Sequence, residues 1–579
     1  MFEIEDVNQA FEEFNRIIVT IYNESYPLIT KRVPLYNFKN PWLTSAIKQS
    51  IKNKNKLYKK IIKRTISLGP LYRTYRNHLT KIINHAKNNY YRIKFENCKG
   101  KIRDTWQTIN KILGKNKAAL TNTFKIRNIY TDDKNTIANN FNNFFSSIGV
   151  ETANKLRNAE TNYIDYLPNA NYDSISWQET NIHEIKRIVS QSKDSSPGPD
   201  TIPMKVFRNN IDYLSPILTH LCNISIRSGI FPSMHKIGKI IPLYKSEDKH
   251  DIKNYRPICL LNTISKILEK VVSTRLMKHL EDNNILSQNQ YAYRKGRGTD
   301  LAATALVKDV LRGFEDNKMT IGIFLDLTKA FDCVNHNILI HKLKHYGINN
   351  TAIAWFTDYL TNRSQYVNFK GFCSDHKNIN ISVPQGSILG PALFLIYIND
   401  FCDVIQSGKQ VVFADDANYY ETGSNYQYIH RRVNDNLKLI VKWFLANRLS
   451  INVIKSEAML FTRRKFYFPV MPVLLDNNEI PFNFTFKFLG LILDFKLNQI
   501  SHVKRIQSKL SSVCGILYEI RNKLTRSVAR IIYLSIGFPY INYCVTLWAS
   551  CAESYLKSLF VTQKKLIRRI MKKNRIEPN

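Results

Sequence analysis

The chain has 579 residues, of which 44% are hydrophobic and 12% aromatic, so it can form several packed subdomains and is too apolar for a disordered polymer. Lys and Arg number 84 against 46 Asp and Glu, giving a net charge of +38, which favours a polyanionic partner, nucleic acid first. The longest apolar runs, such as residues 392–398, fall far short of the roughly 18 to 20 residues of a membrane span. The acidic, amphipathic start is unlike a signal peptide.

The nine cysteines form no CxxC pair and show no Cys–His spacing suited to zinc. We therefore expect reduced thiols and a nuclear or cytoplasmic location. The bias towards Lys, Asn and Ile can also reflect the base composition of the coding DNA, in which case part of the charge is incidental.

Residues from about 5 to 118 have apolar positions at helical spacing between Lys and Asn. From Ser25 to Phe95 there are 17 Lys or Arg and no Asp or Glu, whereas a solvated structural helix usually mixes the two signs. This pattern predicts a basic helical extension over residues 1–125 that contacts nucleic-acid backbone. The carboxy-terminal run QKKLIRRIMKKN has the same character, and a solvated face is the alternative there.

From Ser195 onward, turn dipeptides alternate with short apolar runs and helices, which indicates mixed α/β structure. Two runs, TIGIFLDL (320–327) and VVFADDA (411–417), are predicted to be buried strands that carry Asp326 and the pair Asp415 and Asp416. Carboxylates in such places are costly unless a cation compensates them. Mg²⁺ prefers oxygen ligands and suits phosphoryl transfer, although an isolated Asp-Asp dipeptide is more often a solvated turn.

Seven blocks occur in a fixed order: LYKSED, NYRPICLLNTISKILEK, QYAYRKG, FLDLTKAFDCV, VPQGSILGPALFLIYIND, FADDA and FKFLGLILD. This series resembles the reverse transcriptases of LINE-type non-LTR retrotransposons, especially the Jockey and CR1-like group. The resemblance runs from about residue 130 to the end of the chain. More loosely, it includes NPWLTSAIKQSIKNKNKLYKK, which is similar to the spacer upstream of the polymerase.

The resemblance implies that Asp326, Asp415 and Asp416 are catalytic and bind two Mg²⁺ ions, with Mn²⁺ as a possible substitute. Phe331 would crowd the sugar 2′ position and so select dNTPs, the alternative being an ordinary core residue. Gln385 and Gly386 would lie against the incoming nucleotide, the alternative being an ordinary strand-to-helix turn.

Three further residues and one segment carry an implied role in the family pattern. Arg294 would contact the nucleotide and Arg256 the nucleic acid, because guanidinium groups pair well with phosphate. The alternative for both arginines is an ordinary solvated surface position. Lys455 would donate a proton to pyrophosphate, and surface is again its alternative. The segment Phe488, Leu489 and Gly490 resembles the hairpin that grips the primer, where packing is the alternative.

The resemblance implies an α+β fold shaped like a right hand, with a basic helical extension before the fingers, palm and thumb. The expected domains are the extension (1–125), a linker and fingers entry (126–194), fingers and palm (195–494) and a helical, truncated thumb (495–579).

The implied activity is RNA-directed DNA synthesis on an RNA template and DNA primer, within target-primed reverse transcription. We expect no endonuclease domain in this chain, so that nicking activity would be needed in trans, and no membrane partner. Two alternatives stay open: a catalytically silent remnant that only binds nucleic acid, and an RNA-dependent RNA polymerase.

Overall fold

The computed structural model describes residues 2–27, 29, 40–62, 68–98, 101–114, 121–169, 171–405, 407–464, 471–520 and 525–571. The chain forms two compact units, each assembled from two separate segments. Unit 1 comprises residues 1–28 and 120–489, and unit 2 comprises residues 29–119 and 490–579. Among the described helices, none combines the length and apolar character that a bilayer crossing needs.

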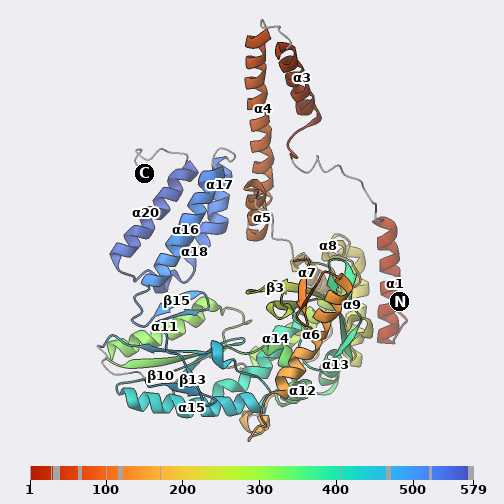
Figure 1. The fold of residues 1–579 in the computed structure, drawn as a ribbon. Coiled ribbons are helices and arrows are strands. Elements are labelled where there is room, and N and C mark those ends of the chain that lie inside the picture. Colours follow the sequence, from red (N-terminus) through yellow and green to blue (C-terminus); the bar gives the residue numbers. More distant parts are fainter. Residues whose placement is uncertain are drawn as a thin grey trace. The chain divides into compact units, whose positions relative to one another are not determined.

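Unit 1 contains two main sheets surrounded by helices (Figure 1). Its helices are α1 (Val7–Ser25), α6 (Lys134–Asn154), α7 (Ile182–Gln191), α8 (Met204–Asn209), α9 (Ile211–Ser228), α10 (Thr263–Asp282), α11 (Thr299–Glu315), α12 (His336–His345), α13 (Asn350–Leu360), α14 (Leu389–Ile398) and α15 (Tyr426–Ala446). Its strands are β1 (Phe124–Ile126), β2 (Ile129–Thr131), β3 (Ile237–Tyr244), β4 (Tyr255–Leu260), β5 (Met319–Leu325), β6 (Arg363–Phe369), β7 (Phe372–Cys373), β8 (Lys377–Ile379), β9 (Lys409–Phe413), β10 (Asp416–Gly423), β11 (Glu457–Phe461), β12 (Val473–Leu475), β13 (Asn478–Ile480) and β14 (Thr485–Phe488).

The four-stranded sheet has the order β11-β5-β10-β9, and all its pairings are antiparallel. Every residue of β5 is buried, which explains its uninterrupted apolar sequence, since a central strand covered on both faces has no polar side. Helices α11 and α15 pack against this sheet. The other sheet has the order β4-β3-β6-β7, with β8 beside β6.

The amphipathic amino-terminal helix α1 belongs to unit 1, whereas the sequence analysis places it in the basic extension. Its buried face is formed by Val7, Ala10, Phe11, Phe14 and Ile18, which join the main core of unit 1. Asp6 caps the helix, because its side chain accepts a hydrogen bond from the Gln9 amide. The apolar face of this acidic, amphipathic helix therefore packs into unit 1, and the helix is not part of the basic extension.

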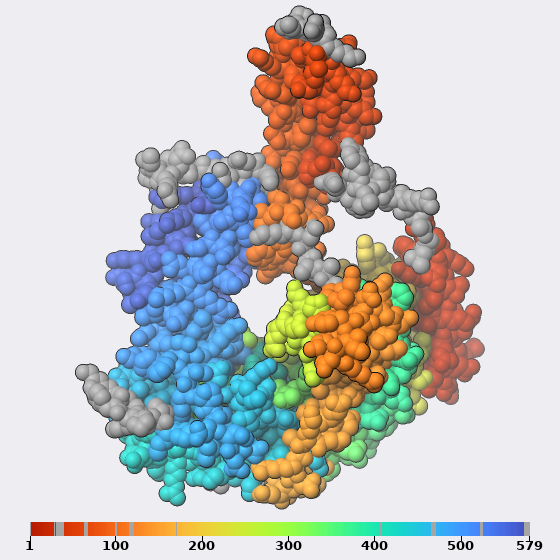
Figure 2. All heavy atoms as spheres, in the orientation of Figure 1, coloured from red at the N-terminus to blue at the C-terminus, as the bar shows by residue number. Residues whose placement is uncertain are grey.

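Unit 2 is mostly helical, as the sequence predicts for both of its segments. It contains α3 (Ser45–Ile62), α4 (Gly69–Glu96), α5 (Ile102–Ile112), β15 (Leu491–Asp494), α16 (Ile500–Ile520), α17 (Arg526–Ile532), α18 (Phe538–Asn542), α19 (Val545–Trp548) and α20 (Glu553–Met571). Figure 2 shows the surface of α3 and α4 in red to orange. Helix α3 buries only Ile47, and its Lys52, Lys56 and Lys59 are exposed. The last residues of the basic carboxy-terminal run, 572–574, lie outside the described residues.

Candidate active site

The three predicted carboxylates meet at one end of the four-stranded sheet. Asp326 directly follows β5, and the register that pairs Ala417 with Leu325 sets Asp416 beside Asp326. Asp415 lies in the tight turn between β9 and β10, next to Ala414, whose φ of 55° is left-handed. The prediction of one continuous strand over 411–417 is therefore wrong: β9 ends at Phe413, residues 414 and 415 form a hairpin turn, and Asp416 is the first residue of β10.

Mutual repulsion marks these carboxylates as an electrostatic cluster. Both Asp415 and Asp416 are solvent-accessible, yet enough protein surrounds their carboxylates for desolvation to matter. Burial, then the charges of Asp415 and Asp326, raise the pKa of Asp416 to about 6. Burial and Asp326 also raise the pKa of Asp415, while Arg256 and Lys245 act in the opposite direction. The cluster would therefore gain from a bound cation.

Positive side chains from β3 and β4 face this cluster. Leu243 pairs with Arg256 in the β3–β4 register, and Lys245 follows the end of β3. Arg256 and Lys245 are exposed, and both influence the pKa of Asp415. They also influence Lys329, whose pKa is lowered chiefly by burial. Arg256 and Lys245, close enough to Asp415 to affect its pKa, can bind a polyphosphate that reaches the carboxylates.

Lys245 and Lys329 were not singled out from the sequence, although the blocks LYKSED and FLDLTKAF contain them. A lysine just after an apolar strand is the available signal, and it is weak, because such lysines are usually solvated. Tyr293 was also missed. It is exposed, and it lies close enough to Asp415 for that charge to add to the effect of burial in raising the Tyr293 pKa.

Arg294 has other partners. Its guanidinium donates to both carboxylate oxygens of Glu281, at 2.9 and 2.6 Å, and to the carbonyls of Leu286 and Ser287. The residue is only 8% exposed. This is the environment of a structural ion pair that anchors the loop after α10, and contact with a nucleotide would require the pair to open.

Phe331 and the Pro-Gln-Gly turn are held together. Phe331 lies in a 3₁₀ turn (Ala330–Cys333) and stacks on Phe394 of α14, with centroids 4.4 Å apart. Its carbonyl accepts a hydrogen bond from the Val383 amide at 3.1 Å. The ring is half-buried, so it packs on the core through one part and remains accessible through another. Both interpretations of Phe331 from the sequence are compatible with this position.

Gly386 has a backbone conformation that other residues adopt only with strain. Its φ is +125°, and a Cβ built there would lie 2.5 Å from the carbonyl oxygen of Cys259. The Cys259 amide in turn donates to the Gln385 carbonyl at 2.8 Å. Glycine is therefore needed because the turn passes directly over β4.

We expect Gly386→Ala to destabilise the protein by about 2 kcal/mol or more, because strain at φ and a backbone clash add together. Thermal unfolding of the full chain measures this. Gly371→Ala is the matched control, since its φ is +93° but a Cβ there meets nothing within 4 Å. Equal losses in the two variants would show that the close approach to Cys259 contributes nothing.

The remaining predicted residues lie around the sheet. Lys455 is exposed at the end of a 3₁₀ turn (Val453–Lys455), just after Asn452, whose amide donates to the Asp326 carbonyl at 2.7 Å. Phe488 is 2% exposed and contacts Phe324, so its side chain packs in unit 1. Leu489 ends unit 1 and Gly490 begins unit 2.

The donor chemistry of the cluster fits a hard divalent cation. In the described part of the chain, no group of three or more His, Cys, Asp or Glu side chains is already arranged around a metal position. Carboxylate oxygens alone are nevertheless the ligands that Mg²⁺ and Mn²⁺ prefer, with substrate phosphates completing the coordination. Asp326, Asp415 and Asp416 are the residues that would hold such ions.

Comparison with known proteins identifies similar sequences. The family model described as reverse transcriptase (RNA-dependent DNA polymerase) matches residues 247–493. The chain is 29% identical over 391 residues to a probable RNA-directed DNA polymerase from transposon X-element of Drosophila melanogaster, covering 66% of this chain and 43% of the relative. It is 26% identical over 446 residues to the RNA-directed DNA polymerase from mobile element jockey of the same species, covering 75% and 48%. The chain thus spans less than half the length of these relatives.

Proposed function

We propose that this protein is an RNA-directed DNA polymerase, because residues 247–493 match the reverse transcriptase family model and the chain is similar to polymerases of non-LTR retrotransposons. The observation that carries the proposal is the meeting of Asp326, Asp415 and Asp416 at one end of a sheet, with Lys245 and Arg256 opposite. The substrates would be an RNA template, a DNA primer and dNTPs.

In this proposal the carboxylates act through bound metal. Two Mg²⁺ ions would supply the positive charge that activates a primer 3′-hydroxyl and stabilises the α-phosphate during its transfer. Lys245, Arg256 and Lys329 would bind the triphosphate oxygens, and Lys455 would donate a proton to the leaving pyrophosphate. Phe331 would exclude the ribose 2′-hydroxyl, and Gln385 and Gly386 would contact the incoming nucleotide.

The right-hand architecture is part of the same proposal. Residues 195–320 would form the fingers, with a return near 340–385, the four-stranded sheet would be the palm, and the helices after about residue 495 the thumb. In target-primed reverse transcription the primer would be a nicked chromosomal end.

Primer extension on an RNA template tests the activity. With Mg²⁺ and dNTPs we expect DNA product, and with rNTPs little or none. Efficient rNTP use would favour an RNA-dependent RNA polymerase. Salt-sensitive binding of the folded protein without any product would favour a silent remnant and exclude the proposed activity.

We propose that α3 and α4 bind nucleic-acid backbone through their lysines and arginines. From Ser25 to Phe95 the sequence is basic without an acid, and Lys52, Lys56 and Lys59 are exposed on α3. Each phosphate contact releases condensed counterions, so log K falls as log salt rises. Replacing these three lysines with Gln should make that negative slope shallower by about 2 to 3. Filter binding between low and moderate salt measures the slope.

The matched control removes the same charge from unit 1 at three exposed lysines. This control leaves the proposed contact surface intact, so the slope of log K against log salt should become shallower by less than about one. Equal slopes in the two triple variants would mean that net charge alone, and not α3, governs binding. The control residues are Lys193, Lys205 and Lys278.

A further inference from the structure

Residues 330–336 hold the first part of the turn before α14. The carbonyl groups of Phe331 and Val334 accept hydrogen bonds from the amides of Val383 and Ser382. The Nε2–H of His336 donates to the Ser382 carbonyl at 2.7 Å. These contacts are all made by backbone atoms of the turn, so they set its path without orienting any of its side chains.

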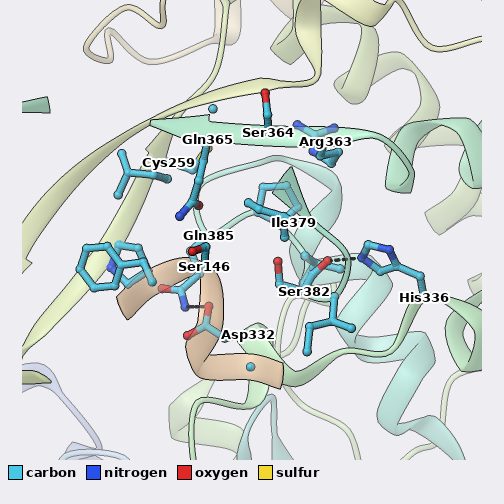
Figure 3. A pocket seen from close by; sticks show the side chains of 18 residues that line it. Ser146, Cys259, Asp332, His336, Arg363, Ser364, Gln365, Ile379, Ser382 and Gln385 are labelled. Carbon is cyan, nitrogen blue, oxygen red and sulfur yellow. Dashed lines mark hydrogen bonds between the residues drawn. The ribbon is translucent and has the colours of Figure 1, made fainter. Parts of the chain in front are cut away.

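A side-chain contact orients Gln385. Its Nε2 donates to Oδ1 of Asp332 at 2.7 Å, and Figure 3 shows the two groups facing each other beside the pocket, joined by a dashed line. The Gln385 carbonyl is held separately by the Cys259 amide. Backbone and side chain of Gln385 are thus held by different elements, so the side-chain contact can be removed on its own.

Asp332 is an unusual partner for an amide. The residue is 8% exposed, and its Oδ2 is buried without a hydrogen-bond partner among the described residues. Asp332 lines a small pocket of about 40 Å³ together with Ser146, His336 and Gln385, and a cavity of this volume has room for a water molecule. Burial raises the Asp332 pKa to about 6, and the Lys329 charge and the hydrogen bond from Gln385 oppose this rise by favouring the ionised form.

An ionised carboxylate only accepts hydrogen bonds. It can therefore pair with the NH₂ end of the Gln385 amide and not with the oxygen end, which excludes the flipped rotamer. Oε1 and the second N–H of Gln385 are left to face away from Asp332. A neutral Asn or Ser at position 332 could pair with either end of the amide and would lose this selection.

We propose that Asp332 is a positioning residue that fixes the orientation of the Gln385 carboxamide and thereby presents its oxygen to the incoming dNTP. This inference rests on the proposed function, because it requires Gln385 to contact the nucleotide. Asp332 itself does not touch the substrate. Its removal should weaken nucleotide binding and leave the chemical step largely intact.

The test is single-nucleotide incorporation by the full chain with Asp332→Asn. We expect KM for dNTP to rise roughly three- to tenfold, as for loss of one hydrogen bond, with kcat within twofold of wild type. Asp332→Ser should behave in the same way. Asp358→Asn is the matched control, since Asp358 pairs with Lys236 at 2.6 Å outside this turn, and should leave KM unchanged.

A double-mutant cycle separates this role from a purely structural one. In a Gln385→Ala background, Asp332→Asn should change KM by less than about twofold, because the group through which it acts is gone. Additive effects, a fall in kcat at unchanged KM, or a wild-type KM in both Asp332 variants would each overturn the proposal. So would failure of both variants to fold, since the proposal assigns Asp332 no essential part in stability.

Failure of the proposed function gives a different result. If the wild-type chain makes no product, the polymerase activity is excluded. The orientation of Gln385 can then still be tested by equilibrium binding of dATP in Mg²⁺. Equal dATP affinity of wild type and Asp332→Asn would overturn the inference by itself.

Discussion

Asp415→Asn is expected to reduce dNTP incorporation by roughly a hundredfold to a thousandfold or more, the loss that follows removal of one preorganised electrostatic contact. The substitution keeps the size of the side chain and removes one of three negative charges. It should also relieve the repulsion that, after burial, raises the pKa of Asp416 to about 6, so the protein should be no less stable. Primer extension under single-turnover conditions measures the rate, and filter binding checks that nucleic-acid affinity is retained.

Asp375→Asn is the matched control, since Asp375 is exposed and lies in the loop before β8. It should extend primers at the wild-type rate. Retention of substantial activity by Asp415→Asn in Mg²⁺ would exclude Asp415 as a required metal ligand. Excess Mn²⁺ should restore part of the mutant activity, because Mn²⁺ binds the same kind of oxygen and imidazole sites more tightly than Mg²⁺ does.

Asp400→Ala is expected to destabilise unit 1 by about 3 to 5 kcal/mol, the usual result of leaving one member of a buried ion pair alone. Lys342 and Asp400 are both fully buried and lie 2.5 Å apart. The carboxylate also accepts a hydrogen bond from Trp443 Nε1 at 3.0 Å. Burial lowers the Lys342 pKa, and loss of the opposing charge would lower it further. Hydrogen exchange at α12 and α14, together with denaturant unfolding, measures the loss.

Two controls identify the cause of that loss. The double variant Lys342→Met with Asp400→Leu should recover much of the stability, because apolar residues avoid the desolvation penalty. Asp316→Ala removes an exposed partner of Lys318 and should cost less than about 1 kcal/mol. If Asp400→Ala were as stable as Asp316→Ala, the buried pair would contribute nothing to the fold.

Much of the fold could be predicted from local patterns. The strand β5 was predicted because a strand buried on both faces must be apolar throughout, and the helix α14 because its ten residues are apolar too. The helical character of α3 and α4 was predicted from spacing. The turn that separates β9 from β10 was missed, because Ala414 has no glycine-like signal for its left-handed conformation.

The partners of charged side chains could not be predicted in the same way. Arg294 and Glu281 are separated by 13 residues, and Lys342 and Asp400 by 58. Nothing in the neighbourhood of either cation shows whether it will meet a phosphate or a carboxylate. The packing of α1 in unit 1 could not be predicted for the same reason. The sequence of an amphipathic helix shows which face is apolar but not which core that face packs against.

By itself, the sequence determined that the chain contains an apolar strand leading to Asp326, a basic segment with helical spacing and an ordered series of blocks that resemble those of reverse transcriptases, since these depend on residue type and short spacing. Only the tertiary structure decided that Lys245 and Arg256 face Asp415, that Arg294 is engaged by Glu281, and that Gln385 is oriented by Asp332. The physical reason is that hydrogen bonds and electrostatic interactions weaken as the distance between the two groups increases, so they need partners that lie close in space. They are therefore set by the packing of elements distant in sequence.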